Sequence, residues 1–165
     1  MRFGGLTVTS LVVATVAIIL TGGAGAAITT IGPWYWGLRK PSWNPPEWAF
    51  GPAWTTIYAF TASAAVIAWN SASATTAERV RLLSALALNI LLNIAWSALF
   101  FRFRRPDWAL IEVAALWLSI LALVLVARPM SRAASWLFVP YLAWVSFASV
   151  LNQRIVALNR PFPHS

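Results

Sequence analysis

The sequence predicts an all-α integral membrane protein: a single domain over residues 1–165, with five transmembrane helices and a long ordered loop between the first two. Of the 165 residues, 60% are hydrophobic and only 10% are charged, against roughly 25% charged residues in an ordinary soluble domain. The charged residues stand in ones, twos and threes between long apolar blocks. Because such a composition cannot cover a water-soluble surface, the blocks are expected to face lipid or other helices.

The distances between charged residues locate the helices, since a helix needs about 20 apolar residues to cross the hydrocarbon core. Glycine, proline and arginine residues close most of the apolar intervals. Asp107, directly after Pro106, is expected to cap the fourth helix. The predicted helices span about residues 6–28, 50–69, 82–101, 107–127 and 133–156.

The first apolar block has a second interpretation. Arg2, the apolar run and the small residues from Ala24 to Ala26 could form a cleavable signal peptide. The run is longer than the hydrophobic region of most signal peptides, and small residues also suit close packing of membrane helices. A membrane helix is therefore the favoured interpretation.

The positions of Lys and Arg predict the orientation of the chain. Successive connections lie on opposite sides of the membrane. The side of the N-terminus then has five Lys and Arg residues, and the side of the long loop and the C-terminus has seven. The positive-inside rule then places the long loop and the C-terminus in the cytoplasm, and we expect a bacterial membrane, inner or outer. The net charge of +8 is spread over these connections instead of one wet face, so no nucleic-acid partner is expected.

Residue types with metal or nucleophilic chemistry are scarce. The chain has no cysteine and a single histidine, His164. No metal site is expected, and no catalytic residues, because no acid, base and nucleophile are grouped. Glu112, the only acid inside a predicted span, is expected to reach the interface near its helix N-terminus, with a partner contact or a proton relay as alternatives.

The connection between the first two helices is unusually aromatic. Residues 34–51 contain four tryptophans and three prolines, and the prolines predict a stiff, extended cover from Pro41 to Pro46. An aromatic belt that anchors helix ends at the headgroups would account for the tryptophans by composition alone. Their order is more specific, because residues 34–48 read W-Y-x-x-L-x-K-P-x-W-x-P-P-x-W.

This order, followed by Trp54 and Tyr58, resembles the signature of the translocator protein family, also called tryptophan-rich sensory proteins (TspO/MBR). Residues 93–101 are similar to the family's N-x-x-W-x-P-x-F-F, and residues 140–152 to its P-Y-x-x-W and A-x-x-L-N. Two positions depart from the pattern. Ala98 replaces the usual proline, which predicts a third helix without a kink, and Gln153 replaces a tyrosine of the animal cholesterol motif, which leaves sterol binding open.

Helical spacing places polar and aromatic residues on common faces of the third and fifth helices. Interhelical hydrogen bonds and ordinary packing are one interpretation. The resemblance favours another, a ligand cavity between the helices beneath the long loop. The ligand-binding residues expected on this basis are Tyr35, Trp43, Pro45, Trp54, Asn89, Asn93, Trp96, Ser97, Tyr141, Trp144 and Ala148, with Arg39 and Lys40 placed to meet ligand carboxylates.

The resemblance implies a membrane receptor or sensor that binds tetrapyrroles such as protoporphyrin IX or haem, and other hydrophobic small molecules, with no obligatory cofactor. Any haem is expected to bind without an axial Cys or His ligand. A transporter of porphyrin or lipid and a light-dependent porphyrin-degrading protein are the alternatives. Contact with membrane lipid and a homodimer are also implied, and small residues permit close helix approach at Gly22, Ala26, Ala87 and Ala95.

Overall fold

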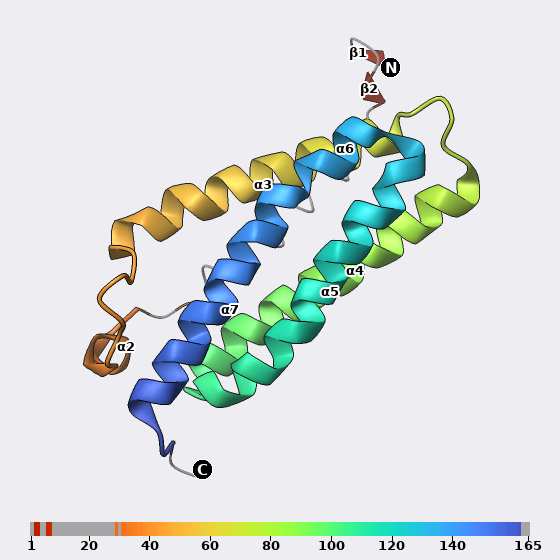
Figure 1. Cartoon of the computed structure of the whole chain (residues 1–165). Coiled ribbons are helices and arrows are strands. Elements are labelled where there is room, and N and C mark those ends of the chain that lie inside the picture. The colour runs from red at the N-terminus through yellow and green to blue at the C-terminus, as the bar shows by residue number, and fades with distance from the viewer. Residues whose placement is uncertain (1, 4–5, 8–28, 30, 163–165) are drawn as a thin grey trace.

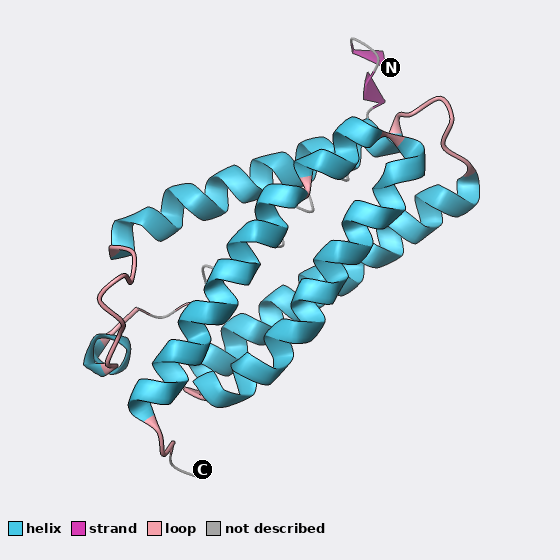
Figure 2. Cartoon of the chain, in the orientation of Figure 1, coloured by secondary structure: helices cyan, strands magenta, loops and turns pink. Residues whose placement is uncertain are grey.

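The structure is a computed structural model that describes residues 2–3, 6–7, 29 and 31–162, and its described part is almost wholly helical (Figures 1 and 2). Two very short strands pair antiparallel near the N-terminus. The elements in chain order are β1 Arg2–Phe3, β2 Leu6–Thr7, α2 Pro33–Gly37, α3 Glu47–Trp69, α4 Thr76–Ser97, the π-helix η1 Ala98–Arg102, α5 Pro106–Met130, α6 Arg132–Leu137 and α7 Val139–Asn159.

Helices α4, α5 and α7 run side by side, whereas α3 meets the others beside α6 and separates from them towards its own N-terminus (Figure 1). The helix predicted for residues 6–28 lies outside the described residues, apart from Leu6–Thr7, which form β2. The signal-peptide alternative concerns the same segment. The number of five transmembrane helices therefore stays a prediction.

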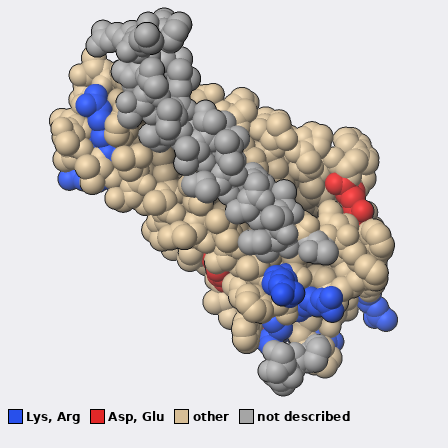
Figure 3. Space-filling view, turned by 180° about the vertical axis from the view of Figure 1, so that it is seen from behind, with Lys and Arg blue, Asp and Glu red and all other residues tan. Residues whose placement is uncertain are grey.

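Three helical stretches of the described part are long and apolar enough to cross a membrane: Thr76–Arg102, Pro106–Met130 and Arg132–Asn159. Helix α3 does not join them because its threonines and aromatic residues lower its mean hydropathy, although its 23 residues would extend about 34 Å. On the face seen in Figure 3, Lys and Arg lie at the two ends, and the described surface between them carries few charged residues. This distribution suits an integral membrane protein.

Helix α4 begins six residues earlier than the charge pattern predicts. The Thr75 N–H donates to Glu78 Oε2 at 2.8 Å, and the Glu78 N–H donates to Thr75 Oγ1 at 3.2 Å. This capping box satisfies N–H groups that have no partner within the helix, so the polar residues taken for a loop form its first turns.

The prediction that Asp107 caps the fourth helix is wrong. Helix α5 begins at Pro106, whose missing N–H suits the first helical position, and Arg105 is its N-cap. Asp107 lies in the first turn, where its carboxylate forms a 2.6 Å ion pair with the Arg105 guanidinium. The negative charge still lies where the helix dipole favours it.

The predicted fifth helix is divided into α6 and α7 at Phe138. Pro140 is the cause, because proline has no N–H to donate to the residue four positions earlier and its ring clashes with that carbonyl. Ser131 caps α6 by accepting a hydrogen bond from the Ala134 N–H at 3.3 Å. The division lets α6 turn across α3 before α7 descends along α5 (Figure 1).

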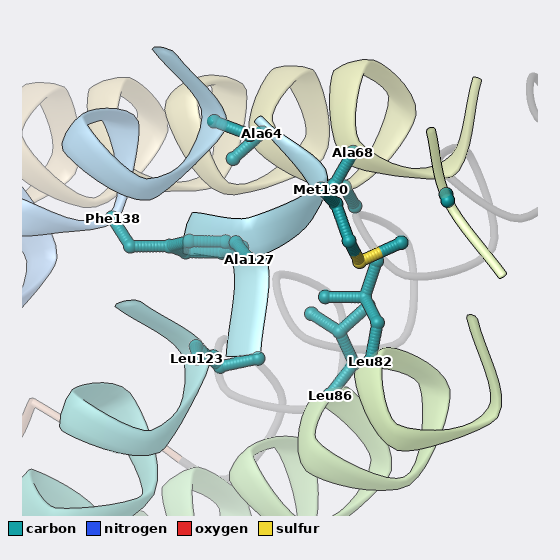
Figure 4. Close-up of a cluster of buried hydrophobic side chains, with 11 residues drawn as sticks. Ala64, Ala68, Leu82, Leu86, Leu123, Ala127, Met130 and Phe138 are labelled. Carbon is teal, nitrogen blue, oxygen red and sulfur yellow. The ribbon is translucent and has the colours of Figure 1, made fainter. Parts of the chain in front are cut away.

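Small side chains hold α3, α4, α5 and α6 together at one end of the bundle (Figure 4). Met130 and Phe138 fill the space that the small side chains leave, and Phe138 is fully buried. We call this group the alanine cluster. Its buried members are Ala64, Ala65, Ala68, Ala74, Leu82, Leu86, Leu123, Ala127, Met130, Ala134 and Phe138.

Candidate functional site

The other end of the bundle contains a cavity of about 600 Å³, within the range of roughly 300–1,000 Å³ for small-molecule sites. We call it the aromatic cavity. Helices α3, α4, α5 and α7 form its walls, together with η1 and the segment that precedes α3. The described residues that line it are Thr29, Ile31, Tyr35, Glu47, Trp48, Phe50, Gly51, Trp54, Thr55, Tyr58, Asn93, Trp96, Ser97, Phe101, Val113, Leu116, Trp144, Val145 and Ala148.

Helix α3 contributes a stacked pair of rings. Trp54 and Tyr58 are four residues apart and therefore lie one above the other on the same face. Their ring centroids are 5.3 Å apart with an interplanar angle of 27°. The Trp54 ring also meets Trp144 of α7 edge-on at 6.4 Å, which joins two walls of the cavity.

Helix α4 supplies the polar groups of the cavity. Asn93 Nδ2 donates to the Tyr141 hydroxyl at 3.0 Å, so this amide is held by α7. Trp96 Nε1 is buried and has no hydrogen-bond partner among the described residues. A buried indole N–H normally finds an acceptor, so a ligand oxygen or nitrogen in the cavity could satisfy it.

The π-helix η1 places aromatic rings at the end of the cavity. Regular α-helix ends at Ser97, and the next five residues form wider turns. The Trp96 and Phe100 rings stack at 5.1 Å, and Phe101 lies 4.8 Å from Phe100. Although no proline is present, regular helical geometry changes at Ala98, the position where the sequence predicts an undisturbed helix.

Helix α7 forms another wall of the cavity. Trp144 and Ala148 are four residues apart and both line the cavity. Phe50 packs edge-on against Trp144 at 5.9 Å, which ties the start of α3 to this wall. The methyl group of Ala148 leaves space that a larger side chain would fill.

The segment before α3 is fixed to the end of α7. The Arg39 N–H donates to Asn159 Oδ1 at 2.9 Å, and Asn159 Nδ2 donates back to the Arg39 carbonyl at 2.8 Å. The Asn44 N–H donates to the Pro41 carbonyl at 2.9 Å, which closes a turn. The prediction of an extended cover from Pro41 to Pro46 is therefore wrong for its first half, because this hydrogen bond folds the chain back.

Tyr35 and Glu47 both line the cavity. Tyr35 is buried, and Lys40 Nζ lies 4.3 Å from its ring centroid. Burial, and then the negative charge of Glu47, raise the pKa of Tyr35 above its ordinary value. This phenol is therefore neutral at physiological pH and can offer a hydrogen bond.

Seven of the residues predicted to bind ligand line the aromatic cavity together. They come from α2, α3, α4 and α7, so residues distant in sequence are adjacent here. The seven are Tyr35, Trp54, Asn93, Trp96, Ser97, Trp144 and Ala148.

Six other predicted residues do not line it: Trp43, Pro45, Asn89, Tyr141, Arg39 and Lys40. Trp43 packs on Phe147 at 5.9 Å, and Pro45 lies in the connection before α3, where its carbonyl accepts from Asn44. Asn89 Nδ2 donates to Ser119 Oγ at 2.9 Å, and Tyr141 is buried behind Trp54.

Sequence reasoning missed several lining residues, among them Glu47, Trp48 and Tyr58. Tyr58 had a usable signal, since it follows Trp54 by four residues and shares its helix face. Trp48 had one as well, since it is the last tryptophan of the aromatic signature, whereas Glu47 had none, because its place depends on where α3 begins.

The prediction that the Glu112 carboxylate reaches the interface is wrong. Both of its oxygens are shielded and have no hydrogen-bond partner among the described residues. The described part of the chain contains no group of three His, Cys, Asp or Glu residues that could hold a metal ion.

The fold and the cavity together define a helical integral membrane protein with a ligand-sized, aromatic-lined site between its helices. Residues 11–158 match the TspO/MBR family, and the chain belongs to that family. A tryptophan-rich protein TspO from Chlorobaculum tepidum is 39% identical over 127 residues, which cover 76% of this chain and 80% of that protein. A tryptophan-rich protein TspO from Archaeoglobus fulgidus is 34% identical over 93% of this chain and 99% of its own. The Homo sapiens translocator protein is 35% identical over 72% of this chain and 70% of its own.

Proposed function

We propose that this protein is a membrane receptor that binds a flat, hydrophobic tetrapyrrole, such as protoporphyrin IX or haem, in the aromatic cavity. The observation that carries the proposal is a cavity of about 600 Å³ walled by indole and phenol rings, with a Trp96 N–H that has no hydrogen-bond partner among the described residues. Aromatic macrocycles gain free energy by stacking on such rings and by leaving water.

The polar groups of the cavity would orient the bound ligand. The Trp96 N–H and the Tyr35 hydroxyl can donate to acceptor atoms on the edge of a macrocycle, while the rings of Trp54 and Trp144 cover its faces. Because Asn93 is already held by Tyr141, it contributes a fixed dipole at the wall. The cavity therefore offers a preorganised site for one planar ligand.

Binding is tested by titrating the protein in a neutral detergent with protoporphyrin IX and following tryptophan fluorescence and the Soret band. Ala148→Leu, which fills space in the cavity, is expected to weaken binding at least about tenfold. Trp43→Phe removes an indole outside the cavity and is the matched control, with affinity expected within about twofold of the parent. Equal affinity in all three proteins would place the site elsewhere.

Two other roles are separated by further measurements on the same complex. Relatives carry the names sensory protein and translocator protein, which correspond to a receptor and to a carrier. Ligand flux into sealed vesicles at a rate that depends on the protein would favour the carrier. Illumination in air, which consumes porphyrin in the parent but not in Trp144→Phe, would favour light-driven degradation.

We also propose that the protein forms a homodimer in the lipid bilayer through α4. Ser84, Ala87 and Leu91 are exposed at intervals of three and four on one face of this helix. Small residues let helix backbones approach closely in lipid. Light scattering in detergent is expected to give a dimer that Ala87→Trp converts to a monomer; an unchanged mass for this variant would exclude this face.

A further inference from the structure

The charge carried by the residues that line the aromatic cavity has one sign. Glu47, in the first turn of α3, is the only charged residue among the described residues that line the cavity. Residues 3–38 contain no charged residue in the sequence, so the segment outside the described residues brings no countercharge from that stretch. The charge offered to a bound ligand is therefore negative.

The two cations that precede α3, Arg39 and Lys40, do not line the cavity. Lys40 Nζ donates to the Tyr35 carbonyl at 2.7 Å and to the Leu38 carbonyl at 3.4 Å, and it lies over the Tyr35 ring. Arg39 binds Asn159 through its backbone, and its side chain does not line the cavity. Neither Arg39 nor Lys40 forms an ion pair with Glu47 in the described part of the chain.

The walls of the cavity also favour positive charge. Aromatic rings have a negative face, and a cation above an indole or phenol face is attracted to it. Trp48 and Trp54 belong to the same wall as Glu47, and Tyr35 lies close enough for the Glu47 charge to raise its pKa. A ligand carboxylate next to these walls would be repelled by the negative faces of the rings and by the negative charge of Glu47.

We propose that the aromatic cavity selects hydrophobic ligands by charge, and that it prefers a planar ligand that carries a protonated amine over the same ligand carrying carboxylates. The inference rests on the proposed function, because it assigns ligand chemistry to the same cavity. Glu47 is the residue that sets the preference, and the aromatic rings contribute to it. A carboxylate-bearing ligand binds with its acidic groups directed away from Glu47.

The test uses one macrocycle with three charges: protoporphyrin IX, its dimethyl ester, and its diamide with two aminoethyl arms. In a neutral detergent at low salt, the diamide is expected to bind about threefold more tightly than the ester, and the ester about threefold more tightly than the diacid. Glu47→Gln is expected to remove most of this order, by weakening the diamide and strengthening the diacid. Glu47→Asp keeps the charge and is expected to keep the order.

Glu78→Gln is the matched control, because it makes the same change in net charge as Glu47→Gln. Glu78 lies in the first turn of α4, away from the cavity, which contacts the last turns of this helix, and glutamine preserves a capping box. This variant is expected to keep the order of the parent. Detergent partitioning of each probe cancels when its affinity for the parent is divided by its affinity for a variant. Equal ratios for the three probes between the parent and Glu47→Gln, or a ratio in favour of the diacid, would overturn the inference while leaving the proposed function standing. No binding of any of the three probes would overturn both.

Discussion

The two ends of the bundle are built from largely the same helices, but their side chains pack differently. At the alanine cluster, small side chains let α3 approach α6, and Phe138 is fully buried among them (Figure 4). At the aromatic cavity, α3 has separated from the other helices (Figure 1), and large rings such as Trp54 and Trp144 line a hollow. Small residues thus close one end, and large residues on separated helices leave the other open.

The contrast has a physical basis in the membrane. Lipid chains are as apolar as leucine, so helices in lipid associate mainly through close packing and hydrogen bonds. Alanine faces allow that packing, whereas rings held at a distance by their own edge-on contacts cannot close the space between backbones. The closed end therefore stabilises the fold, and the open end is available for a ligand.

The largest effect is expected at the closed end. Phe138→Ala removes a fully buried ring from the alanine cluster and leaves a cavity, so the free energy of unfolding should fall by about 3 kcal/mol. Denaturant titration in detergent, followed by circular dichroism, measures this change. Trp48→Ala removes an even larger ring at the open end, but Trp48 is 75% exposed, and the change should stay below about 0.5 kcal/mol. Similar losses in the two variants would refute the contrast.

An intermediate effect is expected where a buried amide joins α7 to α5. Asn152 Nδ2 donates to the Pro106 carbonyl at 3.0 Å, and its Oδ1 accepts from the Leu110 N–H at 3.1 Å, in the amide orientation that satisfies both groups. Asn152→Ala should lower the free energy of unfolding by about 1–2 kcal/mol in the same titration. Gln153→Ala, at the exposed neighbouring position, is the control and should change little; a loss equal to that of Asn152→Ala would show that the amide bonds do not matter.

The smallest effect on stability is expected inside the cavity. Trp96→Phe removes an indole N–H that has no partner among the described residues, so no hydrogen bond to any of them is lost. The free energy of unfolding should change by less than about 0.5 kcal/mol, while porphyrin affinity should fall about threefold if the N–H donates to the ligand. A large loss of stability with unchanged affinity would mean that Trp96 packs as a structural residue.

The sequence was sufficient to locate the helical segments within residues 47–159, because charge-free intervals of about 20 residues leave few other structures in a membrane. The sequence was not sufficient to predict the residues at which the helices begin and end. The capping box at Thr75 and the division at Phe138 depend on hydrogen bonds and proline sterics that charge counting does not register.

Within the candidate site, helix periodicity correctly placed Trp144 beside Ala148 on one face. The partners of side chains were harder to anticipate, because they depend on tertiary structure. Tyr141 shares the face of Trp144 but points behind Trp54, where Asn93 binds its hydroxyl. Lys40, expected at the ligand, donates instead to carbonyls of its own connection.

The five residues of η1 let the length of this turn vary. A π-turn takes up about one residue more than an α-turn while the helix axis continues, so η1 accommodates one extra amino acid without changing the direction of the helix before it. Deletion of Ala98 would therefore let Ser97 continue into a regular α-helical turn, and the arginines from Arg102 to Arg105 would keep their approximate place at the end of the helix. The chain could gain or lose one amino acid here without altering any residue of the cavity wall on α3 or α7.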